Sequence, residues 1–164
     1  MVLMDSTELA RLLVKYGANI EEKLRFFKDK NAWETPLTAA AIRNSIGVCR
    51  VLLDAGANIN GPSSNGKPPL ATAAVHGQVD FVKVLLERKA NIQNKIKGNW
   101  TPLTLAAHMG HLDVVKVLVD HGAVGDPSPY RKWKRFQFAK KVPENTKKAI
   151  LELVRSVKHS PKSA

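Results

Sequence analysis

The chain lacks the features that mark several large classes of protein. It has one cysteine, Cys49, among 164 residues, so it can form neither an internal disulfide nor a cysteine-rich zinc site. A reducing compartment, the cytosol or the nucleus, is therefore expected. The first 13 residues include Asp5 and Glu8, and their apolar run is far too short for a signal peptide or a membrane-spanning helix.

Catalytic and ligand-binding motifs are also scarce. No nucleophile and base occur in a supporting motif such as Gly-x-Ser-x-Gly. Residues 61–67 have the Gly-x4-Gly-Lys spacing of a phosphate-binding loop, but Pro68 stands where that loop needs serine or threonine. His108 and His111 could share a helix face, yet no carboxylate or thiol completes a metal-ligand set. We therefore expect no enzyme, no cofactor and no metal site.

What the chain does have is a repeated pattern with a fixed spacing. Pro36, Pro69 and Pro102 stand 33 residues apart, each within a similar short segment, and a second segment follows each copy at a constant distance. The first segments are Thr35-Pro36-Leu37-Thr38-Ala39-Ala40-Ala41, Pro68-Pro69-Leu70-Ala71-Thr72-Ala73-Ala74 and Thr101-Pro102-Leu103-Thr104-Leu105-Ala106-Ala107; the second are Leu52-Leu53-Asp54-Ala55-Gly56-Ala57-Asn58, Leu85-Leu86-Glu87-Arg88-Lys89-Ala90-Asn91 and Leu118-Val119-Asp120-His121-Gly122-Ala123. Two motifs in register through three copies indicate a repeat architecture.

Each copy is predicted to form a pair of helices. Thr35 or Thr101 can cap a first helix that begins with the following proline, because the N–H that proline lacks has no helical partner there. The second helix has apolar residues at helical spacing. Gly56 and Gly122 stand where that helix must end in a left-handed turn, and Lys89 at the same position should strain or loosen that turn. One pair cannot bury its apolar stripe alone, so the pairs should stack into a solenoid with a continuous core.

This 33-residue pattern, which extends over residues 6–126, resembles the ankyrin repeat. The resemblance implies an all-α solenoid of stacked helix–turn–helix units with β-turn or hairpin tips. Cys49 falls where such repeats have a core valine, so a buried thiol is expected. The histidine that usually ties adjacent turns is replaced here by Thr38, Ala71 and Thr104, which predicts looser turns.

The ends of the array are expected to be irregular, as terminal repeats usually are. An apolar pattern predicts a final amphipathic helix over about residues 143–158, which would cap the stack. The expected organisation is a partial repeat at 1–28, full repeats at 29–61, 62–94 and 95–126, and a basic linker with the capping helix at 127–164 in the same domain.

Positive charge is concentrated beyond the repeats. Residues 127–164 hold 11 basic and 2 acidic residues, a net charge of +9, whereas residues 1–126 contribute only +3. The segment 131–141 alternates cations with aromatics, which suits binding to nucleic acid, to an anionic membrane or to an acidic protein, and also resembles a nuclear localisation signal. Alternatively, Trp133, Phe136 and Phe138 cover the open end of the last repeat while the basic groups stay solvated. The candidate polyanion-binding residues are Arg131, Lys132, Trp133, Lys134, Arg135, Lys140 and Lys141.

The ankyrin resemblance also implies the main function, which is binding of a partner protein. Ankyrin domains mostly use the tips of the turns and the inner face of each first helix. Carried over by position, these sites are Trp33, Glu34, Arg43, Asn65, Lys67, His76, Asn99, Trp100, His108 and Met109. Tryptophan and arginine commonly anchor interfaces, although Trp100 could instead lie flat on the neighbouring tip. We expect a monomeric, non-catalytic scaffold or adaptor in the cytoplasm or nucleus; the alternatives are a nucleic-acid or anionic-surface binder and a fragment of a larger scaffold.

Overall fold

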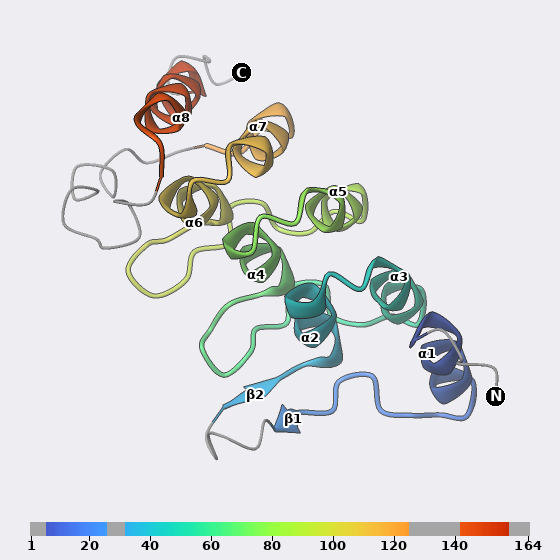
Figure 1. Cartoon of the computed structure of the whole chain (residues 1–164). Coiled ribbons are helices and arrows are strands. Elements are labelled where there is room, and N and C mark those ends of the chain that lie inside the picture. Colours follow the sequence, from blue (N-terminus) through green and yellow to red (C-terminus); the bar gives the residue numbers. More distant parts are fainter. Residues whose placement is uncertain (1–5, 26–31, 125–141, 158–164) are drawn as a thin grey trace, which may run out of the picture.

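The computed structural model describes residues 6–25, 32–124 and 142–157 of the chain. Within them the chain forms eight helices and a two-stranded antiparallel sheet. The helices are α1 (Ser6–Lys15), α2 (Pro36–Arg43), α3 (Ile46–Asp54), α4 (Pro69–Val75), α5 (Val79–Glu87), α6 (Pro102–Met109), α7 (Leu112–Asp120) and α8 (Glu144–Val157), and the strands are β1 (Leu24–Arg25) and β2 (Trp33–Glu34). One layer contains α2, α4 and α6, and the other contains α1, α3, α5 and α7 (Figure 1). This arrangement confirms the predicted all-α solenoid.

The first helix of a repeat begins as its sequence predicts. At α2 the Thr35 hydroxyl accepts a hydrogen bond from the backbone N–H of Thr38 (3.1 Å). At α6, Thr101 and Thr104 form a reciprocal capping box. The buried hydroxyls of Thr38 and Thr104 also donate to the carbonyls of Thr35 and Thr101, at 2.9 Å in both turns. The threonines therefore bond the turns before α2 and α6 to their own helices, whereas the turn before α4, with Pro68 at its N-cap, has no side-chain cap bond.

Other residues join neighbouring repeats. The backbone N–H of Trp33 donates to Ser64 Oγ (3.0 Å), and the N–H of Ser64 donates to the Trp33 carbonyl (2.9 Å). At the opposite end of the first helices, the ring nitrogen Nε2 of His111 lies 2.9 Å from the carbonyl of Val75. This contact gives His111 a structural role between neighbouring repeats.

The core lies between the two helix layers and runs through all the repeats. The first helices supply buried alanines, which let the layers approach closely, while the second helices supply the bulk. Leu52, Leu85 and Leu118 take equivalent positions and are 5%, 0% and 0% exposed. Cys49 on α3 is fully buried, as predicted, and this burial raises the pKa of its thiol to about 12.

The turns after the second helices need a left-handed backbone. Gly56 and Gly122 adopt φ angles of 90° and 84°, and Lys89 adopts 61° at the equivalent position. A side chain in this region crowds the following carbonyl and costs roughly 1 kcal/mol relative to glycine. The predicted strain at Lys89 is therefore present.

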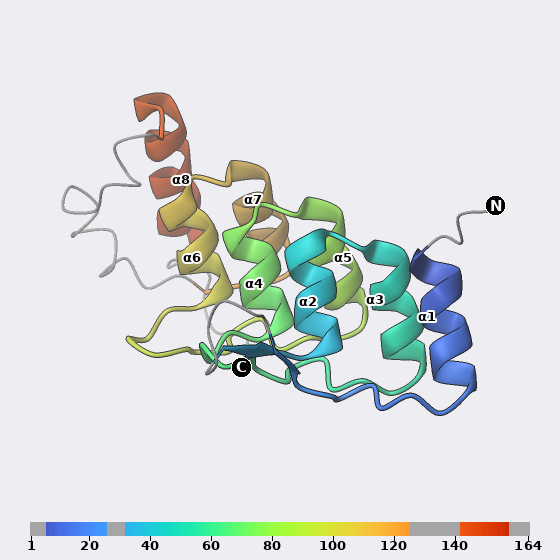
Figure 2. The same ribbon diagram turned by 60° about the horizontal axis from the view of Figure 1, so that its bottom comes forward.

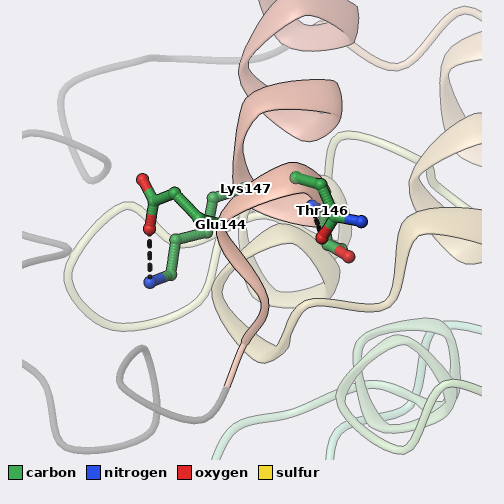
Figure 3. A network of polar contacts seen from close by, with 4 residues as sticks. Glu144, Thr146 and Lys147 are labelled. Carbon is green, nitrogen blue, oxygen red and sulfur yellow. Dashed lines mark hydrogen bonds and ion pairs between the residues drawn. The ribbon is translucent and has the colours of Figure 1, made fainter.

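Helix α8 covers the C-terminal end of the stack by packing against α7 (Figure 1). Ile150 and Val154 on its inner side are 0% and 1% exposed. At its start, Lys147 Nζ pairs with Glu144 Oε2 at 3.1 Å (Figure 3). Only 22% of the Lys147 side chain is exposed, although its charged end reaches this carboxylate.

Helix α1 lies at the N-terminal end of the described stack, in the layer of the second helices. It packs against α3, where Thr7 lies so close to Gly47 that a Cβ atom at Gly47 would collide with it. The connection that follows contains β1 and β2, and residues 26–31 between them lie outside the described part of the chain. None of the described helices is long and apolar enough to cross a membrane.

Candidate protein-binding surface

Equivalent positions of the three full repeats form rows across one side of the molecule. We define the concave surface as the tips of the turns together with the exposed sides of α2, α4 and α6. Because these helices lie side by side (Figure 2), residues 33 positions apart in the sequence become neighbours. The tip row is Glu34, Lys67 and Trp100, and the two helix rows are Ile42, Val75 and His108, then Arg43, His76 and Met109.

The helix rows present both apolar and cationic groups. Ile42 on α2 is 40% exposed, and Val75 on α4 and Met109 on α6 are half-buried. Arg43 and His76 are exposed. The core therefore leaves much of these side chains available, and together they can offer a partner an apolar contact next to a guanidinium group.

Trp100 stands at the tip of the last full repeat and is half-buried. Its carbonyl accepts a hydrogen bond from the N–H of Ile96 (2.9 Å), which closes the turn. Its ring meets the His108 imidazole edge-on, with 5.1 Å between the ring centroids and 69° between the planes. The ring thus packs against a helix of its own repeat. Tip and helix are therefore connected through two aromatic rings.

The imidazole of His108 favours its neutral form. Its partial burial lowers the pKa of the imidazole below the usual 6.5, because the charged form loses water there. At pH 7 the ring therefore packs against Trp100 as an uncharged aromatic group.

Trp33 is held at the first tip from two sides. Its backbone exchanges hydrogen bonds with Ser64 of the next repeat, and β2 pairs with β1 through Trp33 and Arg25. The Nζ atom of Lys23 lies 4.6 Å from the centre of the Trp33 ring, a cation–π contact worth about 0.5–1 kcal/mol at an exposed site. Trp33 is half-buried and already occupied by Lys23, so it offers less open surface than Trp100.

Glu34 departs from the prediction. We expected it to contact a partner, but it is only 9% exposed, and its Oε2 atom is buried without a hydrogen-bond partner among the described residues. Pairing of β2 with β1 places Leu24 opposite Glu34, which covers this position of the tip. Its place in the tip row is as predicted, but its accessibility is not.

The remaining tip residues shape the turns as well as exposing polar groups. Asn65 Oδ1 accepts hydrogen bonds from Ser63 Oγ (2.8 Å) and from the backbone N–H of Lys67 (3.0 Å). Asn99 adopts a left-handed φ of 61°. Both asparagines are exposed, whereas Lys67 is half-buried. Their first role is therefore to hold the tips in one conformation, which limits the entropy lost when a partner binds.

The predicted polyanion-binding segment cannot be placed on this surface. All of its candidate residues lie outside the described part of the chain: Arg131, Lys132, Trp133, Lys134, Arg135, Lys140 and Lys141. The same holds for Phe136 and Phe138, the other aromatics that we considered as covers for the last repeat. Within the described part, α8 takes that position.

Sequence reasoning missed two contributors to the tips. Lys23 lies before the first full repeat, and nothing in the repeat pattern pairs it with Trp33. Ser64 falls within a tip, but its bonds to Trp33 depend on the stacking distance between repeats. The described residues contain no group of three or more His, Cys, Asp or Glu side chains that could hold a metal ion.

Most of the chain matches the model of a known protein family. A family model described as ankyrin repeats in three copies matches residues 2–96 and 60–129. A search of curated proteins finds no match to the chain.

Proposed function

The chain belongs to the ankyrin repeat family, whose repeats are general protein–protein interaction modules, and on this premise we propose that it is a non-catalytic scaffold or adaptor that binds one partner protein on its concave surface. Such a protein works by presenting a rigid surface, and the reducing compartment suggested by its single cysteine favours the cytosol or the nucleus.

The observation that carries this proposal is the position of Trp100. It is a large aromatic residue at an exposed tip, supported from behind by His108 and only half-buried. Burying the rest of such a ring against a partner releases water from a rigid apolar surface at little entropic cost. The rows through Ile42 and Arg43 extend the same surface across α2, α4 and α6.

Arg43 gives the surface a polar anchor. It is exposed on α2 and forms no ion pair within the described residues. A guanidinium group binds a carboxylate through two parallel hydrogen bonds. A partner segment with an apolar side chain near an acidic residue would therefore fit. One copy of the chain carries the whole surface, so binding requires no oligomer.

A capture experiment tests the proposal. The parent protein and an Arg43→Ala/Trp100→Ala variant serve as bait in parallel, with Lys83→Ala on α5 as a control on the opposite layer. A partner retained by the parent and by the control, but lost by the double variant at unchanged helical content, supports binding on the concave surface. A partner retained equally by all three baits would show that the binding site lies elsewhere.

A second candidate function is binding to nucleic acid or to another anionic surface through residues 131–141. It is favoured by the 11 basic and 2 acidic residues of positions 127–164. About four phosphate contacts would give a slope of roughly −3 to −4 in log K against log salt concentration. A gel shift with random duplex and single-stranded nucleic acid at several salt concentrations tests this candidate. Charge reversal at Lys132, Lys134 and Arg135 should remove most of the slope without affecting the protein partner.

A further inference from the structure

Helix α1 exposes an apolar stripe. Leu9, Leu12, Leu13 and Tyr16, at the end of the helix, are 47%, 40%, 52% and 77% exposed. Leu12 and Leu13 lie three and four residues after Leu9, and Tyr16 lies four and three residues after them, so all four belong to a single face. The opposite face, which includes Thr7, packs against α3.

Comparison with the equivalent helices of the other repeats shows that the stripe on α1 lacks a covering helix among the described residues. Leu13 lies four residues before Gly17, as Leu52 lies four residues before Gly56. Leu52 is only 5% exposed, and its equivalents in the next two repeats are fully buried. In those repeats the first helix of the same pair covers this side of the second helix. No described helix takes that position over α1, so the stripe has the chemistry of a core surface that faces water.

Charged residues mark one edge of the stripe. At 3.6 residues per turn, Glu8 and Lys15 lie on the same flank of the stripe, about two turns apart. The side chain of Glu8 is 62% exposed and makes an ion pair with Arg11 at 3.5 Å, and Lys15 is exposed as well. The flank is therefore acidic at the N-terminal end of α1 and basic at its C-terminal end.

We propose that a second copy of this chain covers the stripe, with the two α1 helices antiparallel about a two-fold axis. In an antiparallel pair of helices the same flank of each helix faces that of the other, so charges on this flank set the orientation. Glu8 of each copy then meets Lys15 of the other copy. Leu12 lies next to the axis, and Leu9 packs between Leu13 and Tyr16 of the other copy.

A parallel arrangement lacks this complementarity. The flank with Glu8 and Lys15 would then face the opposite flank, which holds the uncharged Ser6 and Ala10. The charges thus select one geometry, and that geometry is isologous, because the same patch serves on both copies.

The association should be weak and concentration-dependent. Two helices of 10 residues bury an area at the small end of protein interfaces, below about 1,200 Å², as in transient complexes. The net charge of +12 on each chain adds long-range repulsion, so physiological salt should favour association over low salt. The expected monomer then dominates in dilute solution. Because α1 belongs to the layer opposite α2, α4 and α6, the concave surface stays free, and this inference does not depend on the proposed function.

Sedimentation velocity of the full chain from micromolar to millimolar concentration tests the proposal. The parent protein should form dimers as the concentration rises. Glu8→Lys and Lys15→Glu each turn two attractive contacts into two repulsive ones, so each variant alone should dimerise about tenfold more weakly. An equimolar mixture of these two variants should regain the parent's affinity, because every contact between unlike copies is again attractive.

Matched variants separate the interface from general effects of charge. Lys83 on α5 pairs with Asp80 at 3.6 Å, also with a spacing of three residues, so Lys83→Glu is the control and should dimerise like the parent. Leu13→Ser should abolish dimers while circular dichroism shows unchanged helical content. A parent that stays monomeric throughout, or single charge variants that associate as tightly as the parent, would overturn the proposal. So would a mixture that regains nothing.

Discussion

At the C-terminal end of the stack, α8 places Ile150 and Val154 against α7, and both side chains are at most 1% exposed. At the N-terminal end, α1 packs against α3 with one face and leaves Leu9 and Leu13 about half exposed. Both helices are amphipathic, and both lie outside the three full repeats. They differ in whether their apolar face has a neighbour within the described part of the chain.

This difference shows what an apolar stripe does and does not specify. The stripe predicts that a helix has one face to bury, but the position of the helix in the stack decides what can cover it. Because repeat stability is a sum of unit and neighbour terms, an end with fewer neighbours should open more easily. We therefore expect the N-terminal end to be the less stable of the two.

Truncation of one leucine or isoleucine in each region should separate the two ends. Ile150→Ala, like Leu85→Ala in the central repeat, removes a side chain that is 0% exposed and should lower the free energy of unfolding by roughly 2–5 kcal/mol. Leu13→Ala removes one that is 52% exposed and should cost less than about 1 kcal/mol. Urea denaturation in dilute solution measures all three. Equal losses at Leu13 and Ile150 would contradict the comparison, and a change below about half a kcal/mol at Leu85 would mean that the repeat register is wrong.

The reactivity of Cys49 reports on opening near the N-terminal end. Cys49 lies on α3, the helix that packs against α1, and burial raises the pKa of its thiol from 9.0 to about 12. Alkylation at pH 8 should therefore require opening, since the thiolate is the reactive form. We expect labelling to be faster than global unfolding predicts, because α1 and α3 open before the rest.

The raised pKa of the Cys49 thiol also makes the free energy of unfolding depend on pH. The buried neutral thiol favours the folded state below pH 9.0, the pKa of the unfolded chain, and this contribution is lost as the pH rises towards about 12. A Cys49→Ala variant should lose this dependence of stability on pH.

The labelling experiment has its own contrary outcome. If alkylation of Cys49 in the parent followed global unfolding alone, the N-terminal end would not open before the rest of the array.

A glycine at the strained turn of the central repeat should strengthen the region between the ends. Lys89→Gly relieves a φ of 61°, and the expected gain in the free energy of unfolding is about 1 kcal/mol. Gly56→Lys is the matched reverse change and should destabilise by a similar amount. If Lys89→Gly left the free energy of unfolding in urea unchanged, the backbone at this turn would not be strained.

Much of the fold was predictable from local patterns. The helix starts at Thr35 and Thr101 and the left-handed turn at Lys89 follow from spacing and residue type, and the structure confirms them. The burial of Cys49, which the ankyrin resemblance implies, is confirmed as well. The accessibility of Glu34 was not predictable, because strand β1, which pairs with β2 at this position, lies before the first full repeat and outside the 33-residue pattern. The cation–π contact of Lys23 with Trp33 was missed for the same reason.

The most direct test of binding on the concave surface is titration calorimetry of the captured partner with the parent, Trp100→Ala and Leu13→Ala. We expect Trp100→Ala to weaken binding by at least about 2 kcal/mol while lowering the free energy of unfolding by no more than about 1 kcal/mol. Leu13→Ala, in the opposite layer at the open end, should leave the affinity unchanged. Equal affinity of the Trp100→Ala variant and the parent would contradict a concave binding site centred on Trp100.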